Sequence, residues 1–185
     1  MKSFLTCAGA LIAAAGLIFA QSPDATETKV IAGNTMTINY ASPPVGKDAG
    51  KLFTKDGRIV KEDTAYPIWR AGDGPATMFH TEADLDLGGL AVPGEKSGTE
   101  QGGWYTLYVD LTDPDHWTLI VNKELHQWGL TYNQPQDLGR VKMTMGKPPA
   151  MVENLKYTLT DLGGNKGRLT LAWENYSASV DFTVK

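Results

Sequence analysis

The strongest constraint on the fold is a two-residue alternation of apolar and polar side chains that recurs along most of the chain. In residues 104–111, Tyr105, Leu107 and Val109 point to one side, while the residues between them point to the other. This spacing is typical of a strand with one buried face. Comparable alternation occurs in residues 34–40, 77–82, 85–92, 117–122, 139–145, 155–159, 169–173 and 180–184. The pattern predicts about ten short strands.

Glycine-rich and polar segments separate these predicted strands. Gly88-Gly89 suits a two-residue hairpin turn, and residues 112–115 and 163–167 contain the residue types that turns require. We expect no helix longer than a turn or two. These features predict an all-β fold, either an antiparallel β-sandwich or a flattened barrel, formed as one domain by residues 34–185.

The N-terminus resembles a secretory signal peptide. Lys2 precedes an apolar run from Leu5 to Ala20, which is shorter than the ~20 apolar residues that a spanning helix needs. We therefore predict a cleaved signal peptide over residues 1–20 and an exported protein, periplasmic or secreted, with no stable membrane span. Residues 21–33 begin with small polar residues and are expected to form a flexible mature N-terminus.

Charge and cysteine content limit the classes of binding partner and the ways in which the mature chain can be stabilised. Removal of residues 1–20 leaves 16 basic and 21 acidic residues, a net charge of −5, with no basic cluster that would favour nucleic acid. The single cysteine, Cys7, lies within the predicted signal peptide, so the mature chain must be stabilised by its core without disulfides. A small molecule, a glycan, a peptide or another protein remains as a possible partner.

Residues 66–77 contain the most suggestive loop, since they combine aromatic and charged residues with two prolines and two glycines. Trp69 and Arg70 could stack on a ligand or bind a carboxylate through the planar guanidinium. Alternatively, Arg70 could bond to Asp73 and hold the loop in place.

The five tryptophans suggest an aromatic binding face. Trp117 and Trp173 alternate with aliphatic residues and are expected in the core, whereas Trp104 shares its side of the strand with polar residues. Trp69 and Trp128 lie in irregular segments, which often carry function, although either ring could instead plug the end of a sandwich. The candidate ligand-binding residues are Trp69, Arg70, Asp73, Trp104 and Trp128.

A metal-assisted hydrolase is the alternative function. Its site would require His80, His116 and His126 to converge with carboxylates, yet their spacing contains no recognisable zinc motif. No serine or cysteine nucleophile motif is present either. We therefore expect no catalytic residue, no metal and no cofactor, and favour a non-catalytic binding or interaction module.

The order and spacing of several short motifs resemble a bacterial exported family known as domain of unknown function 2911. The motifs span the mature chain: residues 40–43, 69–72, 76–77, 87–89, 92–94, 105–107, 117–123, 128–129 and 171–174. Gly74-Pro75 replaces an expected Asn-Glu pair, and residues 95–102 look like an insertion. The resemblance implies an exported β-rich domain and no established activity.

Overall fold

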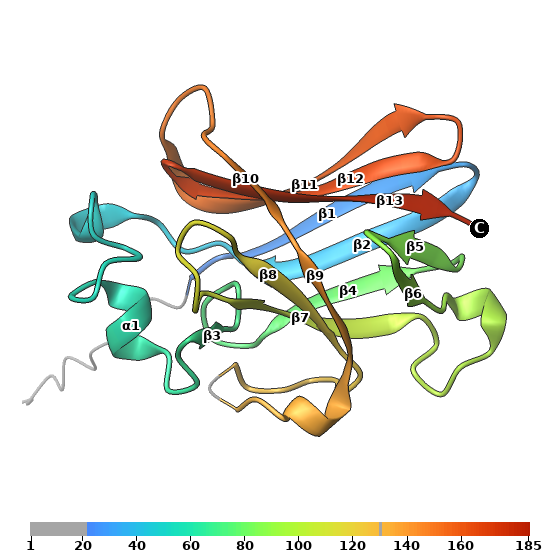
Figure 1. Ribbon diagram of the computed structural model, residues 1–185, viewed down its shortest axis with the longest axis horizontal. Helices are drawn as coiled ribbons and strands as arrows, with labels where there is room; N and C mark the ends of the chain where they lie inside the picture. The colour runs from blue at the N-terminus through green and yellow to red at the C-terminus, as the bar shows by residue number, and fades with distance from the viewer. Residues whose placement is uncertain (1–21, 130) are drawn as a thin grey trace, which may run out of the picture.

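The computed structural model describes residues 22–129 and 131–185, so the predicted signal peptide lies outside the described residues. The described chain forms two antiparallel sheets (Figure 1). The first sheet contains β1 (Asp24–Ile31), β2 (Asn34–Ala41), β4 (Thr77–Thr81), β7 (Trp104–Asp110), β8 (Thr118–Asn122) and β9 (Asp137–Lys142), with β3 (Ile68–Trp69) beside β7. The second contains β11 (Val152–Gly163), β12 (Lys166–Glu174), β13 (Tyr176–Val184), β5 (Leu85–Leu87) and β6 (Leu90–Val92), with β10 (Thr144–Gly146) beside β13.

The two sheets share one hydrophobic core. Met36 and Leu107 come from the first sheet and Leu171 and Phe182 from the second, and all four belong to a single buried cluster. Figure 1 shows β11, β12 and β13 lying over β1 and β2. The predicted antiparallel all-β architecture is confirmed as two sheets that do not close into a barrel.

Thirteen strands occur within the described residues, rather than about ten. The predicted strand over residues 139–145 is in fact two strands, because the chain passes from the first sheet to the second at Met143. The Gly88-Gly89 hairpin is confirmed, and both glycines have the positive φ that the turn needs.

The expectation of a flexible N-terminus over residues 21–33 is wrong for most of that segment. Residues 24–31 form β1, which pairs with β2 in an unbroken antiparallel register. Only Ile31 of this strand is buried, so β1 lacks the alternation that reveals a strand in the sequence. Pairing with β2 and the bond from Leu159 N–H to the Glu27 carboxylate (3.0 Å) hold it in place instead.

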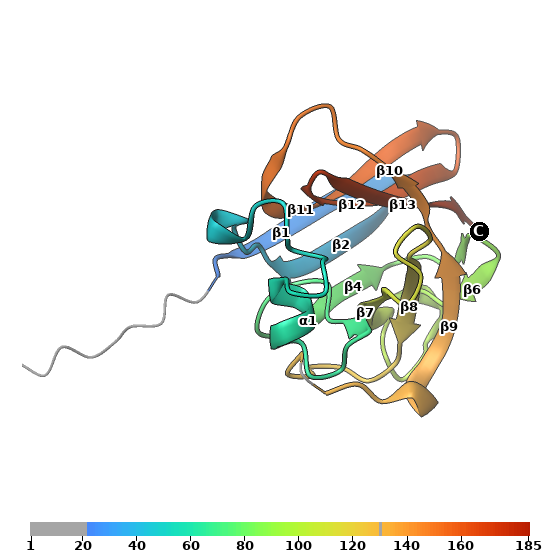
Figure 2. The ribbon, with the colours of Figure 1, turned by 60° about the vertical axis from the view of Figure 1, so that its left-hand side comes forward.

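Residues 46–62, which we name the cap segment, cover one end of the two sheets (Figure 2). They include a 3₁₀ turn at Gly46–Asp48 and the only α-helix among the described residues, α1 (Arg58–Glu62). Further 3₁₀ turns occur at Glu95–Ser97 and Gln134–Gln136. No helix among the described residues is both long and apolar enough to cross a membrane.

The cap segment is attached to the sheets through side chains. Its backbone hydrogen bonds close within residues 45–63, as from Lys51 N–H to Asp48 O (2.9 Å). Leu52 and Ile59 are buried in the common core, and Phe53 is half-buried against it. The cap segment therefore folds as a small unit of its own, and Leu52, Phe53 and Ile59 hold it against the core.

Trp69→Ala should lower the free energy of unfolding by about 3–5 kcal/mol, because the side chain is fully buried and its removal leaves a cavity. The matched control is Trp128→Ala, which truncates a side chain that is 60% exposed and should change stability by less than about 0.5 kcal/mol. Urea denaturation of both variants measures the difference. Equal losses would contradict the burial of Trp69.

Candidate functional site

Five aromatic rings meet where the cap segment covers the sheets, and we name them the ring cluster. Trp69 from the first sheet stacks on Trp173 from the second, with ring centres 5.9 Å apart and planes 14° apart. Phe53 of the cap segment contacts both of these rings edge-on. Trp117 and Tyr176 complete the cluster, stacked at 5.7 Å. The cluster therefore joins the cap segment and both sheets.

On one side of the cap segment, the ring cluster opens into two adjoining hollows of about 340 and 480 Å³. The hollows share Pro114, Asp115 and Tyr176, so we treat them as one surface feature and name it the ring groove. Its aromatic lining consists of Phe53, Tyr66, Trp117 and Tyr176. Tyr66 and Tyr176 are 44% and 36% exposed and present their rings to solvent. This size and composition suit a small-molecule or oligomer-binding site.

The charged groups in the ring groove balance. Lys55 and Lys147 contribute two positive charges, and Asp115 and Glu174 contribute two negative charges. Glu174 is only 2% exposed, has a positive φ of 55°, and its carboxylate accepts a hydrogen bond from Gly50 N–H. The groove therefore combines ring faces with donors and acceptors but has no excess charge.

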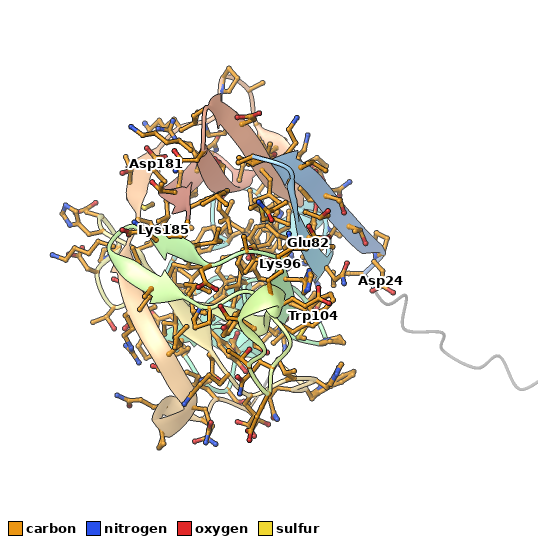
Figure 3. All side chains as sticks on the ribbon, turned by 90° about the vertical axis from the view of Figure 1, so that its right-hand side faces the viewer. Asp24, Glu82, Lys96, Trp104, Asp181 and Lys185 are labelled. Carbon is orange, nitrogen blue, oxygen red and sulfur yellow. The ribbon has the colours of Figure 1, made fainter. Side chains whose placement is uncertain are left out.

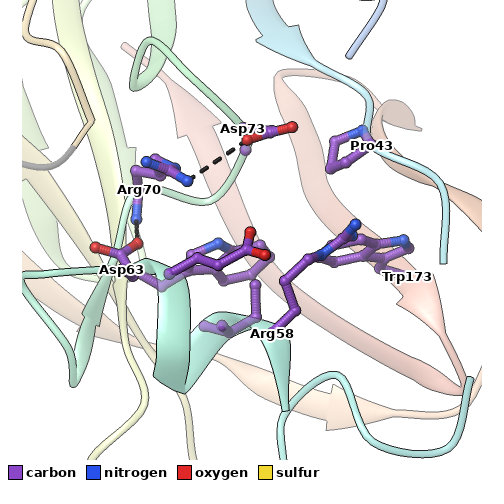
Figure 4. A pocket seen from close by; sticks show the side chains of 10 residues that line it. Pro43, Arg58, Asp63, Arg70, Asp73 and Trp173 are labelled. Atoms are coloured by element: carbon purple, nitrogen blue, oxygen red, sulfur yellow. Dashed lines mark hydrogen bonds and ion pairs between the residues drawn. The ribbon is translucent and has the colours of Figure 1, made fainter. Parts of the chain in front are cut away.

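On the other side of the cap segment lies a cavity of about 10 Å³, which we name the inner cavity (Figure 4). Three buried N–H groups of lining residues have no hydrogen-bond partner: Trp69 Nε1, Trp173 Nε1 and Arg70 Nε. Arg58 lies over the ring of Trp173, with its guanidinium carbon 5.0 Å from the ring centre. Buried donors without a partner are uncommon in folded proteins and cost free energy.

Carboxylates also line the inner cavity. Asp63 accepts hydrogen bonds from the backbone N–H groups of Arg70 (3.1 Å) and Ala65 (3.3 Å), and burial raises the pKa of its carboxyl above the ordinary value. Asp73 faces Arg70 at 3.5 Å and accepts a hydrogen bond from the Ser22 hydroxyl at 2.5 Å. Figure 4 shows Asp63 and Asp73 on either side of Arg70, opposite Arg58 and Trp173.

The structure brings together only part of the ligand face expected from sequence. Trp69 lies in the core and offers no ring to solvent, while Arg70 and Asp73 line the inner cavity. Trp128 is exposed on the neighbouring loop, which pairs with the Arg70–Asp73 loop through Gly129 N–H and Gly74 O (3.0 Å). Residue 129 must be a glycine in this arrangement, since a Cβ at that position would lie 2.2 Å from Arg70 Cδ.

Trp104 lies apart from these residues. It occupies the first position of β7, whereas Trp69 pairs with Val109 near the last position of that strand. Figure 3 labels Trp104 in a view of the side of the molecule that lies away from α1 in Figure 1. Its ring packs against His80, with centres 4.7 Å apart, so the expected five-residue face is split between two ends of a strand.

The three histidines each have separate surroundings. His80 pairs with Glu95 (3.3 Å), His116 pairs with Asp113 (2.9 Å), and His126 lies exposed in a loop. No group of three metal-binding side chains forms within residues 22–129 and 131–185. The geometry therefore gives no support to the histidine site of the hydrolase alternative.

Sequence reasoning missed the residues that form the ring groove. Phe53 and Tyr66 lie in turns, and Tyr176 is the first residue of β13. Aromatic residues in connecting segments were the available signal, because such segments run over the surface and often carry binding residues. Their convergence could not be read from their spacing.

The fold and the site define the class of the protein: a two-sheet antiparallel β protein with an aromatic groove at one end, beneath a cap. Residues 22–182 match the family described as "Protein of unknown function (DUF2911)", and the chain belongs to this family. No curated protein and no solved structure matches the chain.

Asp63→Ala should destabilise the protein by about 1–3 kcal/mol, since two backbone N–H groups lose their acceptor. The loss should depend on pH. Because the folded-state pKa of Asp63 is raised, the native state retains a proton that the unfolded state releases above pH 3.8. The stability contributed by Asp63 is therefore largest at low pH and declines as pH rises through the folded-state pKa.

Urea denaturation of wild type and Asp63→Ala between pH 4 and pH 7.5 measures this difference. The comparison cancels the carboxylates that the two proteins share. A stability difference that grows with pH would show that the carboxyl of Asp63 is instead stabilised in its charged form.

Proposed function

We propose that the protein is an exported, non-catalytic binding module that holds a neutral glycan in the ring groove. One observation carries the proposal: Phe53, Tyr66, Trp117 and Tyr176 line a continuous surface groove that also contains polar groups. The apolar C–H face of a sugar ring packs on an aromatic ring, while its hydroxyls bond to neighbouring polar side chains.

The charge of the ring groove favours a neutral ligand over an acidic or basic one. Two lysines and two carboxylates leave no net charge to attract either kind. A peptide that adds a strand to a sheet would need a free strand edge. Most of the ring groove is instead formed by the connection over residues 111–117 and by the cap segment.

Two residues beside the inner cavity have a strained backbone conformation. Glu174 and Ala71 are non-glycine residues with positive φ, 55° and 54°, and each directly follows a residue that lines the inner cavity. Such conformations cost about 1–3 kcal/mol and are concentrated at binding and catalytic sites. The surrounding structure holds both residues in place, which supports a functional role for this end of the molecule.

The double variant Tyr66→Ala/Tyr176→Ala should weaken glycan binding at least about tenfold, because each exposed ring contributes apolar contact area to the groove. Isothermal titration with cellohexaose, maltohexaose and N-acetylchitohexaose measures the affinity. Trp128→Ala is the matched control, since it removes an exposed ring outside the ring groove.

Two results would count against the proposal. If none of the three oligosaccharides binds to wild-type protein, the groove does not serve neutral glycans of these classes. If Trp128→Ala abolishes binding and the tyrosine variant does not, the ligand lies on the loop that carries Trp128.

We further propose that residues 1–20 direct export and are removed. The apolar run after Lys2 and the small residue Ala20 support cleavage before Gln21. Expression of the full chain in a bacterial host should therefore yield a periplasmic or secreted protein whose N-terminal residue is Gln21. Intact-mass and N-terminal analysis measure this, and full-length protein in the cytoplasm would contradict it.

A further inference from the structure

The inner cavity contains an unusual set of unsatisfied groups that the ring groove does not explain. Trp69 and Trp173 are almost completely buried, Arg70 is 8% exposed, and each has one N–H without a partner. All three line the same cavity. Its volume of about 10 Å³ is close to the smallest space that admits one oxygen atom with its hydrogens.

The groups around the inner cavity restrict what can occupy it. The indole and guanidinium N–H groups require an acceptor, while the carboxylates of Glu62, Asp63 and Asp73 have lone pairs that can accept a further hydrogen bond. A hydroxyl group is both. A carboxylate could only accept hydrogen bonds, and the lining has three acids against two arginines, Arg58 and Arg70, whereas an ammonium group would leave the N–H groups unpaired.

The inner cavity adjoins the ring groove. Ile59 of the cap segment lines both the inner cavity and the 340 Å³ hollow of the ring groove, so the two features lie on either side of this residue. Trp69 and Trp173 of the inner cavity also contact Phe53, which lines the ring groove. A sugar chain bound to the exposed rings would therefore lie close to the polar groups of the inner cavity.

We propose that the inner cavity is a subsite for one hydroxyl group of a neutral sugar whose neighbouring units occupy the ring groove. The hydroxyl oxygen has two acceptor lone pairs, so it accepts hydrogen bonds from two of the three buried N–H groups, and its proton is donated to one of the carboxylates. This inference rests on the proposed function, and it specifies a hydroxyl-rich ligand without acidic groups.

Two-dimensional NMR of protein with ¹⁵N-labelled tryptophan tests the proposal. The chain has five tryptophans, so the five indole N–H signals can be assigned by single Trp→Phe variants. Titration with the neutral hexaose that binds most tightly should shift the signals of Trp69 and Trp173 as well as that of Trp117. An oligogalacturonate of equal length should bind at least about tenfold more weakly, since its carboxylates lack the required proton.

Arg70→Lys provides a second measurement. Lysine retains the charge but cannot place an N–H at the position of Arg70 Nε, so affinity for the neutral hexaose should fall about tenfold. The matched control is Arg168→Lys, which changes an exposed arginine paired with Asp181 and should leave the affinity unchanged. Circular dichroism confirms that each variant retains its fold.

The outcomes separate this inference from the proposed function. A shift of the Trp117 signal alone would show that the ring groove binds glycan and that the inner cavity is not a subsite. Stronger shifts of Trp69 and Trp173 with the acidic oligosaccharide would assign the cavity to a carboxylate and overturn the inference. If no indole signal moves with any of the oligosaccharides, both proposals fail.

Discussion

The contact on which the rest of the structure depends is the stacking of Trp69 on Trp173. One ring comes from each sheet, so their contact at 5.9 Å fixes how the two sheets meet at this end of the core. Phe53 then packs edge-on against both rings and holds the cap segment in position. Among the described residues, the backbone of the cap segment forms no backbone-to-backbone hydrogen bond with a strand of either sheet. The ring groove and the inner cavity exist because the cap segment is held at this position. Large aromatic contacts of this kind combine apolar burial with a preferred geometry, which makes them effective at fixing an orientation.

Much of the fold could be predicted from sequence because the alternation of apolar and polar residues identifies most strands locally. The strands around Leu107 and Leu171 have one face that is strictly apolar, and Trp117 and Trp173 are buried as their alternation predicts. β1 could not be predicted in this way, since its register with β2 and the bond from Leu159 N–H to Glu27 position it while only Ile31 of the strand is buried. The split of β9 from β10 was also hidden, because a strand that changes sheets keeps the same two-residue period.

The candidate site was less predictable than the fold. The segment around Trp69 and Arg70 was singled out from the sequence as a candidate site, but the Trp69 ring is buried in the core and the polar groups of Arg70 and Asp73 face a small cavity. Phe53, Tyr66 and Tyr176 are far apart in sequence, and only tertiary packing brings them to one groove. Alternation reports which face of a strand is buried, but it contains no information about which loops meet at the end of a sheet.

The self-contained hydrogen bonding of the cap segment has a consequence for how this fold can diversify. A loop whose backbone pairs with a sheet cannot change length without breaking strand pairing, whereas the backbone-to-backbone hydrogen bonds of residues 46–62 close within residues 45–63. The N–H groups of Gly46 and Gly50 donate instead to side-chain carboxylates of the second sheet, those of Glu153 and Glu174. The sequence and length of the cap segment can therefore vary with little disturbance to either sheet, provided that Leu52, Phe53 and Ile59 keep their contacts with the core. Replacement of this one segment could in this way change the shape of the ring groove and the inner cavity on the same two sheets, much as an antibody domain varies its loops over a constant framework.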